Sequence, residues 1–184
     1  MSKILKSATY FLCAGLFVAL ISSSFVERAS AIQNAENADV QDLLYQAREE
    51  AVGLDRDADE METFVRSDLD WRTHAEYLEQ VKEHINRLAG IIQKLQAERD
   101  KASPWQQQTI DRVIPLLREL ATNTTNAINH LNQNQIRPVS GNYPTWLHEN
   151  AETAHELVTM ISNTIEYGRT RNRLQKLEED LNKS

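Results

Sequence analysis

The spacing of apolar residues constrains the fold of this chain more than any other feature. From about residue 36 onward, apolar side chains recur at alternating steps of three and four, the period of a helix with one buried face. No window alternates apolar and polar residues with the period of two that a half-buried strand requires. Only 5 glycines and 4 prolines interrupt the 184 residues. The sequence therefore predicts an all-α protein.

Three breaks divide the periodic region. Ser103 before Pro104 predicts a helix start, and Gln106 is placed to complete a capping box. The segment 136–144 contains two prolines and a glycine and cannot continue a helix. The segment 67–70 offers capping side chains for a tight turn. The predicted helices span about residues 36–66, 70–101, 104–134 and 145–181.

The lengths of these helices favour one architecture. The first three are similar in length and have short connections, as an antiparallel up-down-up-down four-helix bundle requires. The apolar stripe of the first ends at Val65, and that of the fourth runs through Val158 to Gly168. The fourth stripe then shifts phase to three leucines near the end of the chain. We therefore expect a longer fourth helix that projects beyond the bundle from about Thr170.

The N-terminal residues have the pattern of a secretory signal. Two lysines precede an uncharged apolar run at 8–21, and Ala29-Ser30-Ala31 supplies the small residues of a cleavage site. We predict a signal peptide at 1–31, a single helical-bundle domain at 32–184, and a periplasmic or secreted location. The apolar run is shorter than the roughly 20 residues of a membrane span, so no membrane association is expected after cleavage. A membrane-tethered form with the signal retained is an alternative.

Charge and cysteine content exclude several classes of protein. The net charge is −7, and loss of the predicted signal leaves the remainder more acidic still, which argues against nucleic acid as a partner. The single cysteine, Cys13, lies within the predicted signal. The mature chain therefore has no thiolate for catalysis, zinc, iron–sulfur clusters or covalent haem. Phosphate-loop, serine-hydrolase and zinc-protease motifs are also missing. We expect no enzymatic activity and no cofactor.

Histidines supply the one alternative to a bundle without ligands. In an antiparallel bundle, His74, His130 and His148 come to the same end, beside the acidic close of the first helix. Imidazoles and carboxylates in that number could hold zinc, copper or iron. The competing interpretation is that these histidines pack or face solvent, because a shared height on the bundle is not a shared direction. A metal- or haem-binding bundle is therefore the alternative function.

Two further patterns relate to such cofactors. Glu152 and His155 form one Glu-x-x-His step, whereas di-iron bundles use two such steps and two more inward glutamates. Met61 and His74 fall near one bundle end, which permits haem ligation without predicting it.

The last segment of the chain points to interaction. Basic residues from Arg169 to Lys176 precede an acidic run at 178–180, and Leu174, Leu177 and Leu181 recur at helical spacing. Such a segment can pair with a second helix. The predicted function is that of an exported, non-enzymatic bundle acting by binding in the cell envelope. Its fourth helix would contact a protein partner or another copy.

Two segments carry a resemblance. Asp57–Phe64 and Ala102–Gln107 resemble stretches of uncharacterised exported helical proteins of bacteria. The resemblance implies the same helical fold and an exported location, and it implies no particular activity.

Overall fold

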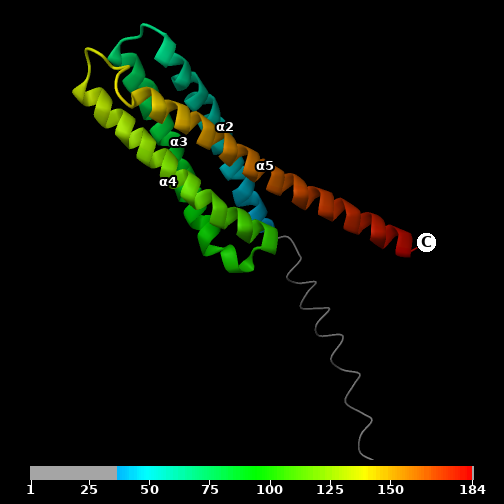
Figure 1. Ribbon diagram of the computed structural model, residues 1–184. Coiled ribbons are helices and arrows are strands. Elements are labelled where there is room, and N and C mark those ends of the chain that lie inside the picture. The colour runs from blue at the N-terminus through cyan, green and yellow to red at the C-terminus, as the bar shows by residue number, and fades with distance from the viewer. Residues whose placement is uncertain (1–36, 184) are drawn as a thin grey trace, which may run out of the picture. The chain divides into compact units, whose positions relative to one another are not determined.

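The computed structural model describes residues 37–183, and the predicted signal peptide at 1–31 lies outside them. Four long helices make up this part of the chain, with no strand among residues 37–183, so the predicted all-α class is confirmed (Figure 1). Short 3₁₀ turns follow the first and second of them, at Phe64–Arg66 and Arg99–Lys101. The long helices are α2 (Ala38–Thr63), α3 (Trp71–Ala97), α4 (Pro104–Gln133) and α5 (Tyr143–Asn182).

The four helices form a closed ring around one core. Each packs against the next along the chain, and α5 packs against α2 to close the ring. Short connections between consecutive long helices reverse the chain direction each time, which gives the predicted up-down-up-down four-helix bundle. Among residues 37–183, no helix is both long and apolar enough to cross a membrane.

Side-chain caps explain where these helices begin. Asp70 accepts hydrogen bonds from the backbone N–H groups of Arg72 and Thr73, both at 3.0 Å, at the start of α3. At the start of α4, Oε1 of Gln106 accepts from the backbone N–H of Ser103 at 2.9 Å, which confirms the predicted boundary. The α5 helix begins two residues before its predicted start, because Pro144 is tolerated in a first helical turn.

Most buried residues follow the predicted stripes, but three stripe positions, Val65, Trp71 and Val158, are only half-buried. Phe64 is buried where the sequence indicated Val65, which is only half-buried. The 3₁₀ turn that begins at Phe64 explains this, because its larger rotation per residue changes which side chain faces the core. Leu157 is fully buried where Val158 was expected. Positions 157 and 158 both fit the helical period, and the larger side chain, Leu157, occupies the core.

The predicted projection of the last helix is also confirmed. The α5 helix is 40 residues long, against 26, 27 and 30 for the other three. Gly168 is the last buried residue of α5. The helix then continues past the ends of the neighbouring helices (Figure 1).

Candidate functional site

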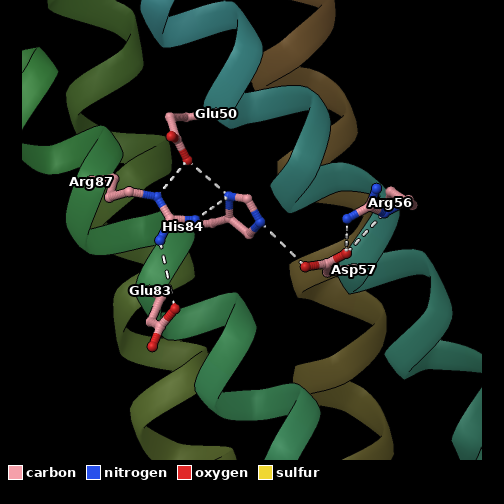
Figure 2. Close-up of polar contacts among 6 residues, drawn as sticks. All are labelled: Glu50, Arg56, Asp57, Glu83, His84 and Arg87. Carbon is pink, nitrogen blue, oxygen red and sulfur yellow. Dashed lines mark hydrogen bonds and ion pairs between the residues drawn. The ribbon is translucent and has the colours of Figure 1, made fainter.

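A histidine on α3 lies between two carboxylates on α2 (Figure 2). Nδ1 of His84 is 2.8 Å from Oε2 of Glu50, and Nε2 is 3.3 Å from Oδ2 of Asp57. The side chain of Asp57 is 5% exposed and that of His84 is 18% exposed. Both ring nitrogens of His84 are thus occupied, and the ring joins α2 to α3 close to the core.

A glycine makes this close approach possible. Glu50 and Asp57 are seven residues apart, so they share one face of α2 with Gly53 between them. A Cβ at position 53 would come within 3.0 Å of both ring nitrogens of His84 and closer still to its Cε1. Glycine in a helix interior costs about 1 kcal/mol relative to alanine. Here that cost gives the imidazole room to lie against the helix between the two carboxylates.

Two arginines extend the cluster. Nε of Arg87 donates to Oε2 of Glu50 at 2.9 Å, and Nη2 of Arg56 donates to Oδ1 of Asp57 at 2.8 Å. Partial burial acts to raise the pKa of Glu50, but hydrogen bonds from Arg87 and His84 outweigh it and leave that pKa lowered. Glu50 is therefore ionised at neutral pH, and the arginines compensate the charge that the carboxylates bring.

This cluster contains a carboxylate and a histidine, as a catalytic triad does, but no nucleophile beside the histidine. A carboxylate that orients a histidine is half of a hydrolase triad, and a nucleophile at the second ring nitrogen is the other half. Here the second nitrogen of His84 faces Asp57. A carboxylate therefore occupies the place of the nucleophile, and the contacts of His84 join α2 to α3.

No role for His84 or Glu50 was predicted from the sequence. A signal for them was present: a glycine in the interior of a helical stretch, with acidic residues three positions before and four after it. Periodicity alone does not say which residue on the next helix fills the space above that glycine.

The three histidines of the metal hypothesis occupy different environments. His74 is fully buried, with Nδ1 3.0 Å from the hydroxyl oxygen of Tyr143 and the edge of Phe64 packed near its ring. Its Nε2 is buried without a hydrogen-bond partner among residues 37–183. Burial lowers the pKa of His74, although the charge of Asp70 partly opposes this. The buried ring is therefore neutral at neutral pH.

His130 also lies against the ring of this tyrosine. Its ring stacks at a 30° tilt on that of Tyr143, with the ring centres 5.4 Å apart. Nε2 of His130 is 3.1 Å from the carbonyl oxygen of Pro138 and 3.2 Å from Oγ of Ser140. His130 thus holds the 134–142 connection against the end of α4.

His148 joins neither of these rings. Its Nδ1 is 2.9 Å from Oε1 of Glu62, its Nε2 is 3.5 Å from Glu152, and the side chain is 54% exposed. The hydrogen bond to Glu62 raises the pKa of His148, and the charge of Glu152 adds to the effect. The structure thus places His74 and His130 around Tyr143 and leaves His148 on the surface between α5 and α2. Within residues 37–183, no three His, Cys, Asp or Glu side chains are grouped so as to hold a metal ion.

The single Glu-x-x-His step also faces outward. The side chains of Glu152 and His155 are 71% and 73% exposed. His155 lies 3.6 Å from Asp55 of α2, whose pKa is raised by partial burial and by the charge of Asp59. Di-iron bundles need such steps to point into the core, and this one does not.

The chain was compared with known protein families, curated proteins and solved structures. No family model, curated protein or solved structure matches the chain. The resemblance of Asp57–Phe64 and Ala102–Gln107 to exported helical proteins stays a prediction. Function is therefore argued from the contacts and exposure of the described residues.

The projecting part of α5 carries an exposed apolar face. Leu174, Leu177 and Leu181, called the leucine stripe below, are 55%, 52% and 76% exposed. At about 100° per residue, the leucine stripe lies roughly 160–220° around the helix from the fully buried Ile161. It therefore points to the side of α5 opposite the core, where no other helix of the bundle covers it.

The base of the projection is fixed to the bundle on two sides. Nε of Arg169 donates to the hydroxyl oxygen of Tyr45 on α2 at 3.0 Å. The guanidinium of Arg171 lies 4.3 Å from the ring centre of Trp105 on α4. Residues 172–182, which follow these two contacts, are all exposed. The leucine stripe is thus presented by a helix whose direction is set at its root.

Proposed function

We propose that the protein is exported, has no enzymatic activity and acts by binding a partner in the cell envelope through the leucine stripe of α5. The observation that carries this proposal is the exposure of three leucines on one face of a helix that has left the bundle. Single exposed leucines are common on protein surfaces and mean little. A contiguous row on a projecting helix is typical of a surface that another helix or groove covers.

The polar clusters of the bundle support binding over catalysis. The two ring nitrogens of His84 face carboxylates, and those of His148 on the surface face Glu62 and Glu152. Neither histidine is placed to activate a nucleophile or a bound water. The leucine stripe, in contrast, has no covering element within residues 37–183.

Site-specific photo-crosslinking in the native host tests the proposal. A photoreactive amino acid placed at position 177 should form a discrete adduct, because that position lies in the middle of the leucine stripe. The same amino acid at Asn86, an exposed residue of α3, serves as the matched control. Equal adduct formation at the two positions would contradict binding through α5.

The same cells test export. The protein should fractionate with the periplasm or the medium, and intact-mass measurement should place its N-terminus at Ile32. A cytoplasmic product that retains residues 1–31 would contradict the exported location.

A further inference from the structure

We infer that the partner of the leucine stripe is a second copy of this chain, paired antiparallel along residues 170–182 of α5. The inference rests on the proposed function, because it concerns the same surface. It assigns the occupant of that surface from the spacing of its leucines and from the order of its charges.

The leucines have the spacing of a two-stranded coiled coil. Leu174 and Leu181 are seven residues apart, and Leu177 lies between them at steps of three and four. In an antiparallel pair centred between residues 175 and 176, Leu174 faces Leu177 of the second copy. Thr170 then faces Leu181 of the second copy. Each of the four layers so formed contains at least one leucine.

The charges beside the leucine stripe on one copy match opposite charges on a second copy that runs antiparallel to it. Arg173 and Asp180 precede Leu174 and Leu181 and so lie along one edge of the stripe, while Arg171 and Glu178 lie along the other edge. When two such helices run antiparallel, like edges meet. Arg173 then faces Asp180 of the second copy, and Arg171 faces Glu178 of the second copy. Twofold symmetry doubles each pair, and no like charges oppose each other along the stripe.

The parallel arrangement is less favourable beyond the projection. It would carry the contact back along the outer face of α5 beside the bundle, past the exposed Tyr167 to Asn163 and Glu156. Each would face its own copy, and the two Glu156 carboxylates would repel each other. The antiparallel pair ends where the projections end, because the two bundles lie at opposite ends of it.

The extent of the contact sets its strength. Residues 170–182 form fewer than four helical turns, so the paired surface falls in the range of small, transient interfaces. We therefore expect a reversible dimer whose population rises with concentration. The contacts of Arg169 with Tyr45 and of Arg171 with Trp105 fix the direction of the helix beforehand, which reduces the entropy lost on pairing.

Sedimentation equilibrium of the protein purified after export tests the inference. Over roughly a thousandfold range of concentration, the weight-average mass should rise from one chain toward two. Leu177→Glu should hold the protein at the mass of one chain at every concentration, with an unchanged thermal unfolding curve. Val52→Glu is the matched control, because Val52 on α2 is another exposed apolar residue, with 48% of its surface exposed. The Val52→Glu protein should dimerise like the unmodified protein. A mass of one chain throughout for the unmodified protein would overturn the inference.

Charge reversal tests the antiparallel direction. Arg173→Glu alone and Asp180→Arg alone should each weaken dimerisation at least tenfold at low salt, because each places like charges opposite one another. The double variant Arg173→Glu with Asp180→Arg should recover it. Recovery by Arg173→Glu with Glu178→Arg instead would indicate the parallel arrangement and overturn the antiparallel one.

The crosslinking described for the proposed function separates the two claims. An adduct at position 177 with twice the mass of the chain supports both. An adduct with a different protein overturns self-pairing and retains the proposed function. No adduct above that at position 86 overturns both.

Discussion

Gly53 on α2 lies directly beneath the imidazole of His84 on α3, with no room between them for a methyl group. An alanine in a helix interior is ordinarily about 1 kcal/mol more stabilising than a glycine. At position 53 we expect the opposite sign, a loss of about 1–3 kcal/mol, because the added Cβ overlaps a ring held at both nitrogens. Urea denaturation followed by circular dichroism measures this.

Gly90 provides the matched control for this substitution. It also lies in a helix, on α3, and a Cβ there would meet no heavy atom within 4 Å. Gly90→Ala should therefore stabilise the protein by about 1 kcal/mol. Adding His84→Ala to Gly53→Ala should relieve the overlap. If both glycines responded alike, the close contact at His84 would be wrong.

The buried histidine predicts a stability that falls with acid. The pKa of His74 is lowered below its usual value of 6.5, so the unfolded chain takes up a proton at a higher pH than the folded one. Its contribution to the free energy of unfolding is full above about pH 6.5 and declines as pH falls toward the folded pKa. His74→Phe should remove this part of the slope. The pKa of His148 is raised, so its contribution to the free energy of unfolding changes with pH in the opposite sense. The quantity to measure is therefore the difference between the stability–pH profiles of the unmodified protein and of His74→Phe.

The partner of His74 supplies a double-mutant control. His74→Phe alone and Tyr143→Phe alone each leave one buried polar group without its 3.0 Å partner, at a cost of about 1–3 kcal/mol. The double variant removes both polar groups, so it should be more stable than the sum of the single losses implies. Additive losses and an unchanged pH profile in His74→Phe would together show that the contact contributes nothing.

The metal hypothesis gives a prediction about added ions. The structure separates His148 from His74 and His130, so zinc or copper should give no stoichiometric increase in thermal stability. A specific site would stabilise the protein by about 2.7 kcal/mol when free metal exceeds the dissociation constant a hundredfold. Thermal unfolding with and without each ion decides this. A one-to-one gain that disappears in His130→Gln and in His148→Gln would revive the metal-binding alternative.

Local chemistry made much of the fold predictable. The helix starts near Trp71 and at Pro104 follow from capping side chains, whose hydrogen bonds form within a few residues of sequence. The alternating spacing of apolar residues indicated nearly the whole core, because side chains three and four residues apart lie on one face of a helix. Phe64 and Leu157 departed from prediction because a change of helical geometry or a choice between adjacent apolar positions depends on the neighbouring helices.

The polar contacts were far less predictable. His84 lies 27 residues from Asp57 and 34 residues from Glu50 in the sequence, on a different helix. Their meeting depends on how far α3 slides along α2, and periodicity does not determine that distance. The expectation that His74, His130 and His148 share an end gave their approximate height. It gave no information on direction, so the stacking of His130 on Tyr143 was not foreseen.

The change of phase along α5 means that the core and the leucine stripe need not vary together during evolution. One residue inserted between Gly168 and Leu174 would turn the stripe by about 100° around the helix axis and leave the bundle as it is. Its leucines would then point toward a different neighbour. Insertions or deletions in that short stretch would therefore redirect the contact made by α5 without any need to rebuild the four-helix core.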